Sequence, residues 1–207
     1  MFQLTRPTPA DIDAFLAAQR GSDFSYPQVG ATRSDLAPAG YDVDRNRVRL
    51  GVGAETFRRA TDALRSWRMS SLGWSTIHSA GAAPMPGVTV AVVVSHLGFW
   101  SLNACRIIYV LEEERDDVSR TSFAYGTLSD HAEIGEERFV VEWKRADDSV
   151  WYDLYAFSRP AHFLARLGYP ISRALQRRFA RESKQAMVAV TPDVAEALKL
   201  GELRGAL

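Results

Sequence analysis

The chain has 207 residues, of which 46% are apolar and 24% are charged, and its 25 basic and 25 acidic residues cancel to zero net charge. This length suits one domain with a closed core, and the absence of a net positive charge argues against a nucleic-acid partner. A single cysteine, Cys105, excludes an internal disulfide and a cysteine-rich zinc site. It is also typical of a protein kept in the reducing cytoplasm, where we expect this one.

The first forty residues are expected to form one helix followed by an irregular segment. Thr8 can cap a helix that has Pro9 in its first turn, whereas residues 21–40 are rich in Gly, Ser and Pro. A first strand is predicted over 41–50. A helix is predicted over 55–67, because one apolar stripe runs along it through Phe57, Ala60, Leu64 and Trp67.

The middle of the chain changes to strand periodicity. Its short polar connections leave no room for crossover helices, so the sheet is expected to be antiparallel. The stretch 69–105 lacks charged residues, but its longest strongly apolar run, Val88–Val94, is far shorter than a membrane-spanning helix. We therefore predict no transmembrane segment and a series of strands over 88–94, 104–111, 119–128, 133–143 and 150–157.

After the strands, Ser158-Arg159-Pro160 is expected to open a long terminal helix with Ser158 as its cap. Gly168 and Pro170 are expected to kink this helix, and a short helix is predicted over 191–201. Its apolar stripe is predicted to run through Leu164, Leu167, Ile171, Leu175 and Phe179. The expected organisation is a wrapping segment over 1–40, one domain over 41–190 and a short terminal helix over 191–207.

This order predicts an α+β fold in which a curved antiparallel sheet wraps around a long C-terminal helix that covers its apolar face. The arrangement is the helix-grip fold. It is similar to the START-like or Bet v 1-like superfamily, and the resemblance implies a cavity for apolar ligands between sheet and helix.

A second resemblance depends on a dense motif. Residues 123–128 read Phe-Ala-Tyr-Gly-Thr-Leu, and His131, Glu133 and Gly135-Glu136-Glu137 follow. Together with Phe24-Ser25-Tyr26-Pro27, Val29-Gly30-Ala31-Thr32 and Ser158-Arg159-Pro160, the motif resembles the domain-of-unknown-function family numbered nineteen-ninety, over roughly 24–184. Ala132 stands where that family often has proline. The resemblance implies a helix-grip fold and assigns no catalytic residue.

His131 and Glu133 are the first candidates for chemistry. With Tyr125 they could supply general acid–base catalysis, and His-x-Glu could supply two metal ligands. No third ligand is identifiable, so we predict that no metal and no cofactor is bound. The alternative is that His131 caps a turn and pairs electrostatically with Glu133 or Glu136.

A ligand-binding set is also predicted. Tyr125 shares a face with Phe123 and Thr127, and its phenol could orient a ligand or pack in the core. The last strand alternates Trp151 and Tyr155 with Tyr152 and Leu154, and parity does not decide which set faces inward. We predict a ligand site made by Tyr125, Trp151, Tyr155 and Arg159.

Arg159 has two possible roles. It either bonds a carboxylate among Glu133, Glu136 and Glu137 or holds an anionic ligand. Residues 110–153 contain thirteen acidic and five basic residues, whereas 159–184 contain seven basic residues and one acidic. A helix would align a basic stripe that is either a solvated face or a docking surface, made of Arg159, Arg166, Arg173, Arg177 and Lys184.

The leading functional hypothesis is a binding protein for a small apolar or amphipathic molecule. One alternative is an enzyme of the same fold that uses Tyr125, His131 and Glu133. Another is an interaction protein with a filled core and a basic docking helix.

Overall fold

The computed structural model describes residues 1–34, 37–79, 81–96, 98–131, 133–161 and 169–191. Its elements, in chain order, are β1 (Phe2–Gln3), α1 (Pro9–Ala18), η1 (Ala31–Ser34), β2 (Asp42–Val52), α2 (Gly53–Arg65), η2 (Arg68–Ser70), β3 (Ser75–His78), β4 (Thr89–Ser95), β5 (Trp100–Glu114), β6 (Val118–Thr127), β7 (Glu133–Lys144), β8 (Ser149–Pro160) and α4 (Tyr169–Ala189). Within the described part of the chain, no helix is long and apolar enough to cross a membrane.

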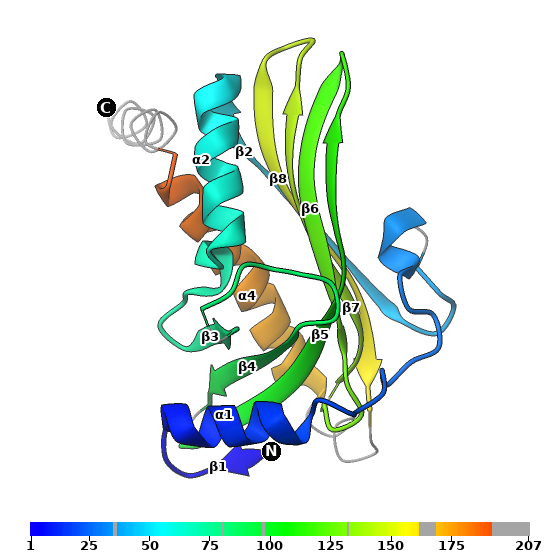
Figure 1. Cartoon of the computed structure of the whole chain (residues 1–207), viewed down its shortest axis with the longest axis vertical. Helices are drawn as coiled ribbons and strands as arrows, with labels where there is room; N and C mark the ends of the chain where they lie inside the picture. Colours follow the sequence, from blue (N-terminus) through cyan, green and yellow to red (C-terminus); the bar gives the residue numbers. More distant parts are fainter. Residues whose placement is uncertain (35–36, 80, 97, 132, 162–168, 192–207) are drawn as a thin grey trace.

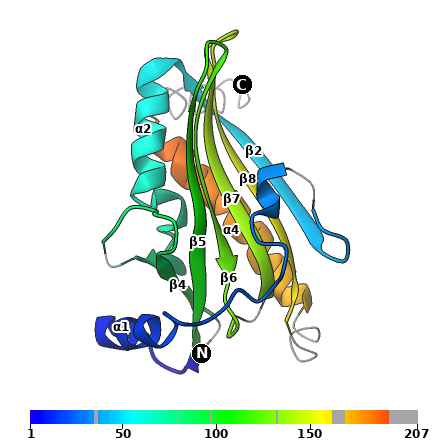
Figure 2. The same ribbon diagram turned by 45° about the vertical axis from the view of Figure 1, so that its right-hand side comes forward.

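The strands form one antiparallel sheet in the order β2-β8-β7-β6-β5-β4-β3, and β1 pairs with β5. The sheet is long and curved, and α2 and α4 lie against one side of it (Figure 1). Turning the molecule shows η1 on the opposite side (Figure 2). We call the side that faces α2 and α4 the inner face and the other side the outer face. The helix-grip fold is thereby confirmed.

The main core lies on the inner face. Its largest fully buried side chains include Tyr152, Phe123 and Phe139, and the Phe123 and Phe139 rings stack 5.1 Å apart. Leu64 brings the end of α2 into this core, and Met187 brings α4. Trp67, predicted as the last residue of the helix, is also in the core but lies beyond the end of α2. Apolar burial at about 25 cal/mol per Å² makes this cluster the main stabilising contribution to the fold.

The outer face is covered near β4 and β5 by α1. The helix begins at Thr8, whose hydroxyl accepts the Asp11 N–H at 3.2 Å, and it buries Ile12 and Phe15. A second segment, residues 24–34, crosses the outer face of β6, β7 and β8, and we call it the outer strap. It begins with a bridge from Phe24 to Leu128.

The junction predicted at Ser158 is wrong. β8 continues through Pro160, so Ser158, Arg159 and Pro160 are strand residues paired with β7. Pairing with the neighbouring strand outweighs the local helix-start signal, which only resembles a cap. The described part of α4 begins at Tyr169 with Pro170 next, and Gly168, Leu164, Leu167 and the short helix predicted over 191–201 lie outside the described residues, apart from Thr191.

The predicted apolar stripe of α4 is confirmed at Phe179, which packs against the main core, and is wrong at Ile171. Ile171 is 69% exposed, whereas Ala180, Ser183 and Met187 are buried. The inward face of the first half of α4 is therefore polar, with Ser172 and Gln176 directed at the sheet.

The basic stripe is not a uniform solvated face. Arg173 forms a bidentate pair with Asp44 of β2 at 2.5 and 2.8 Å, and Lys184 donates to Asn46 at 3.1 Å. Arg159 belongs to β8, and Arg166 lies outside the described residues. The two paired cations fasten α4 to the edge strand instead of presenting a docking surface.

Candidate functional site

A phenol and a carboxylate meet on the inner face of the sheet. Tyr125 of β6 is directly opposite Glu137 of β7, and its hydroxyl donates to the Glu137 carboxylate at 2.5 Å. Both belong to the predicted alternation, because Phe123 and Phe139 are the next residues of the same parity on each strand. The ring of Tyr125 packs 5.4 Å from that of Phe139, so the pair borders the aromatic core.

Burial changes the acid–base properties of this pair. Desolvation raises the pKa of Glu137 to about 7, and the negative charges of Asp44 and Glu133 add to the effect. Desolvation and Glu137 also raise the pKa of Tyr125 well above its usual value. No basic side chain in the described part of the chain forms an ion pair with Glu137. A carboxyl group in this state exchanges protons near neutral pH, as catalytic and ligand-binding groups often do.

The inner face is fully buried on one side of this pair and partly exposed on the other. Tyr152, Phe139 and Leu154 are almost fully buried. In contrast, Glu137 keeps part of its surface accessible, as do the neighbouring inner-face residues Ala156 and Ser158. The polar end of the inner face, beneath the first half of α4, is therefore less buried than the aromatic end.

Polar side chains connect this end to α4. Glu133 accepts hydrogen bonds from the Ser172 hydroxyl and the Gln176 amide. The same amide group donates to the Ser158 hydroxyl at 3.1 Å. The start of α4 is thus held by hydrogen bonds and the Asp44–Arg173 pair rather than by apolar contact.

The three residues predicted to act in catalysis, Tyr125, His131 and Glu133, do not lie together. His131 lies in the β6–β7 connection, where Nδ1 accepts the backbone N–H of Glu133 at 2.9 Å. Desolvation lowers the pKa of His131 to about 4, so the ring is neutral near pH 7. Tyr125 pairs with Glu137, and the carboxylate of Glu133 is directed at α4. His131 therefore caps a turn, but the expected pairing with the Glu133 or Glu136 carboxylate does not form.

The predicted ligand-binding residues lie on two faces. Tyr125 is on the inner face, whereas Trp151, Tyr155 and Arg159 are on the outer face, because Tyr152 and Leu154 of the same strand fill the core. The four residues cannot line one pocket, and the proposed set is corrected in this respect. Strand parity identified the two sets, and the position of α4 decided between them.

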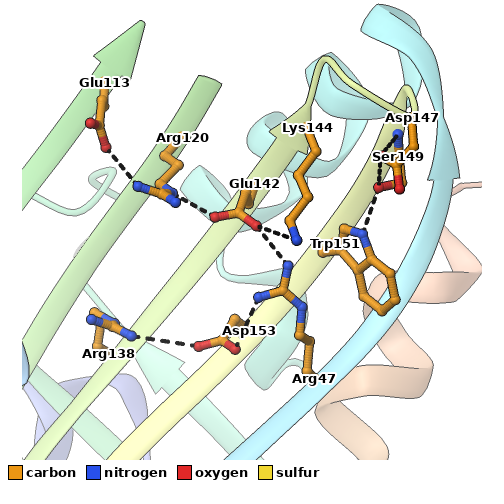
Figure 3. Close-up of polar contacts among 10 residues, drawn as sticks. All are labelled: Arg47, Glu113, Arg120, Arg138, Glu142, Lys144, Asp147, Ser149, Trp151 and Asp153. Atoms are coloured by element: carbon orange, nitrogen blue, oxygen red, sulfur yellow. Dashed lines mark hydrogen bonds and ion pairs between the residues drawn. The ribbon is translucent and has the colours of Figure 1, made fainter. Parts of the chain in front are cut away.

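Outer-face residues form a charged network around Trp151 (Figure 3). Glu142 pairs with Arg47 and Arg120, each at 2.6 Å. The Arg47 guanidinium stacks over the Trp151 ring at 4.8 Å. These contacts cross four strands, so this part of the outer face is covered by ion pairs.

Arg159 does not form the predicted ion pair. It faces outward and lies over the Tyr41 ring at 4.7 Å, whereas Glu133 and Glu137 face inward. The third candidate partner, Glu136, is already bonded by the outer strap.

The outer strap contains two of the motif segments that carried the family resemblance, Phe24-Ser25-Tyr26-Pro27 and Val29-Gly30-Ala31-Thr32. The Glu136 carboxylate, 3% exposed, accepts the Tyr26 hydroxyl at 2.8 Å and the Gly30 and Thr32 N–H groups at 2.7 and 3.0 Å. Gly126 lies beneath Tyr26, where a Cβ atom would overlap the phenol oxygen. Gly126 pairs with Glu136, and the adjacent Tyr125 pairs with Glu137. Side chains of one motif therefore face both the outer and the inner side of the sheet at this place.

A cleft of about 550 Å³ lies among α1, the end of α2, β3 and the loop after it. Its walls include Trp67 of the main core and Ile77, which packs against that core. Within the described ranges, no group of three or more His, Cys, Asp or Glu side chains could hold a metal ion.

Comparison with known proteins identifies the family. The family model "Domain of unknown function (DUF1990)" matches residues 25–186. A UPF0548 protein of Dictyostelium discoideum is 33% identical over 204 residues, covering 91% of this chain and 94% of that protein. A UPF0548 protein of Deinococcus radiodurans is 36% identical over 198 residues, covering 91% and 98%.

Among solved structures, hypothetical protein jhp0584 from Helicobacter pylori has a TM-score of 0.49 and 13% identity, covering 82% of this chain and 96% of that one. The strand order and the helix positions identify the fold. The family match covers β2 to β8, the outer strap from residue 25 and most of α4, in agreement with the motif-based resemblance. The chain belongs to the DUF1990 family.

Proposed function

We propose that this protein binds a small amphipathic molecule on the inner face of its sheet, beneath α4, with Tyr125 and Glu137 as the polar anchor. The observation that carries the proposal is Glu137, a carboxyl group placed beside an aromatic core with a phenol as its hydrogen-bond partner. Such a group costs stability, because a buried carboxylate without a basic partner is poorly solvated. A binding role gives a reason for this cost, as perturbed groups cluster at functional sites.

Two features support a ligand-binding role at this place. The side chains around Glu137 are partly accessible, and the start of α4 is held above them by polar contacts that can exchange with water. Apolar walls with a few directed polar groups are the usual composition of a small-molecule site. The single buried cysteine is consistent with a cytoplasmic location.

The acid–base enzyme alternative loses its support, because Tyr125, His131 and Glu133 have three separate partners. The docking-helix alternative is also weakened, since Arg173 and Lys184 are engaged with β2.

The test is native mass spectrometry of freshly purified protein, followed by solvent extraction and titration with Nile red, a neutral amphipathic dye. We expect a bound small molecule or, in an emptied protein, saturable dye binding that Glu137→Gln alters. Glu112→Gln, at an exposed position, is the matched control and should behave as the native chain. A native protein that carries no adduct and binds no dye contradicts the proposal.

A further inference from the structure

The cleft between α1 and the end of α2, which we call the α1 cleft, is separate from the inner-face site. Its volume of about 550 Å³ lies within the usual range of small-molecule sites. One wall is the face of α1 that carries Ile12 and Asp13, and another is made by Trp67 and the end of β3. Neither Tyr125 nor Glu137 belongs to its walls.

Trp67 fixes the shape of the apolar part of the α1 cleft. Its backbone is left-handed, with φ 60° and ψ 22°, which a bulky residue rarely adopts. The ring packs edge to face on Phe123 at 5.0 Å, and the indole N–H donates to the Ala82 carbonyl at 3.0 Å. A strained backbone persists only where the surrounding contacts enforce it. This wall is therefore held in place without a ligand, which reduces the ordering cost of binding.

The neutral polar groups of the α1 cleft have already used their donor hydrogens. The hydroxyls of Ser66 and Ser79 donate to the carbonyls of Asp62 and Ala82, each at 2.7 Å. The Trp67 N–H is bonded to the same Ala82 carbonyl. A hydroxyl oxygen that donates its hydrogen still has lone pairs to accept with. These groups therefore favour a ligand that donates hydrogen bonds.

Asp13 is the charged acceptor of the α1 cleft. The walls also contain Asp62 and Arg65, but Asp62 pairs with Arg58 at 2.9 Å and Arg65 pairs with Glu112. Among the residues that the structure describes, the Asp13 carboxylate has neither a hydrogen bond nor an ion pair. It is thus available to a cationic group that enters from solvent.

His78 lies in the same wall as β3 and acts electrostatically on Asp13 without neutralising it. Burial lowers the pKa of the His78 ring, and the positive charge of Arg6 adds to this effect against the opposing effect of Asp13. The ring is therefore mostly neutral near pH 7.5. Arg6 is not part of the walls, and its guanidinium lies over the Trp100 ring at 5.5 Å.

We propose that the α1 cleft binds a compact organic amine, whose ammonium group bonds Asp13 and whose apolar body lies against Ile12 and Trp67. This site is a second one, independent of the inner-face site proposed above. An ammonium group donates up to three hydrogen bonds and accepts none, which suits a carboxylate beside hydroxyl oxygens. A carboxylate head would meet the like charge of Asp13 and would find few free donors.

The test compares three molecules that share a phenyl ring on a short alkyl chain, namely 2-phenylethylamine, 2-phenylethanol and 3-phenylpropanoate. Ligand-detected NMR titration near pH 7.5 measures the affinity of each for the whole chain. Asp13 is solvent-exposed, so we expect the amine to bind about fivefold tighter than the alcohol and the carboxylate to bind most weakly. In Asp13→Asn the amine should fall to the affinity of the alcohol, while the alcohol keeps its own.

Two tryptophan variants locate the binding. Ala83→Trp introduces a bulky side chain at an exposed position in the walls and should abolish amine binding. Ala14→Trp, at an exposed position of α1 outside the walls, is the matched control and should bind as the native chain does. Circular dichroism establishes that each variant is folded.

The inner-face variant Glu137→Gln keeps these results distinct from the proposed function, because it should leave amine binding intact. Amine binding that survives Ala83→Trp, or that is lost in Glu137→Gln, overturns the α1 cleft as the site. A preference for the carboxylate, or an amine preference that survives Asp13→Asn, overturns the ligand class. Failure of all three molecules to bind overturns the second site and leaves the inner-face proposal to its own test.

Discussion

Glu137 makes the stability of the fold depend on pH. Its pKa rises from an ordinary 4.5 to about 7 in the native chain, because burial disfavours the ionised form. The native state therefore holds a proton that the unfolded chain releases between these two values. Stability contributed by the protonated group is present at low pH and is lost as the pH rises toward 7.

Glu137→Gln removes this dependence, since the amide does not titrate. We expect the stability of the variant relative to the native chain to increase by about 2–3 kcal/mol between pH 4.5 and pH 8. Urea unfolding at a series of pH values measures the difference. A difference that is constant over this range means that Glu137 is not desolvated.

Two arginines provide a second test at this scale. Arg159 is exposed and stacks on Tyr41, so Arg159→Ala should cost about 1 kcal/mol or less. Arg173 is largely shielded and holds Asp44 in a bidentate pair, so Arg173→Ala should cost about 2–3 kcal/mol. Thermal melts of both variants compare the two arginines. A larger loss at Arg159 would show that its contacts differ from those described here.

At the scale of elements, the outer strap and the inner site bind two neighbouring carboxyl groups of β7 that face opposite sides of the sheet. Glu136 faces outward to the strap, and Glu137 faces inward to Tyr125. Side chains alternate along a strand, so a one-residue slip of β7 would exchange these two carboxyl groups. The strap hydrogen bonds to Glu136 oppose such a slip and keep Glu137 on the inner face.

Gly126→Ala tests this arrangement, because the new Cβ would displace the Tyr26 phenol from Glu136. A buried carboxylate that loses a donor should reduce stability by about 2–3 kcal/mol. Hydrogen exchange should rise across residues 24–34. In a Tyr26→Ala background, Gly126→Ala should be nearly neutral, because the overlap is gone. Additive losses in the double variant would place the strain elsewhere.

Over the whole molecule, the helices and the sheet enclose the inner face. Cys105 lies in the main core at 1% exposed, and burial raises the pKa of its thiol. The thiolate is the reactive form, so both access and reactivity depend on opening of the fold.

A disulfide reagent such as dithionitrobenzoate should therefore label Cys105 slowly in the native protein and rapidly in urea. Arg173→Ala, which loosens α4 from β2, should accelerate native labelling more than Arg159→Ala does. Absorbance at neutral pH follows the reaction. Rapid labelling of the native chain would mean that the inner face opens without global unfolding.

Much of the architecture was predictable from sequence alone. Alternating apolar residues and short polar connections predicted the antiparallel strands, and the Leu64–Trp67 end of one helical stripe was placed correctly in the core. These features depend on local periodicity, which any segment carries within itself. Strand parity also indicated that Glu137 faces inward, because Glu137 alternates in step with Phe139 and Val141. Its acidic side chain argued against an inward position, so it was not predicted as a site residue.

Other features depended on contacts between distant segments. Parity grouped Trp151 with Tyr155 and Tyr152 with Leu154, and only the packing of α2 and α4 decided which pair is inside. A bulge in β5 sends Ile107 inward and Tyr109 outward, although simple alternation puts them on one face.

The end of β8 was set by pairing with β7, against a local helix signal at Ser158. The sequence by itself therefore determined the strands, the main helix and the fold class, because these follow from local periodicity. The tertiary structure alone decided the composition of the site, because a side chain's face depends on where the rest of the chain packs.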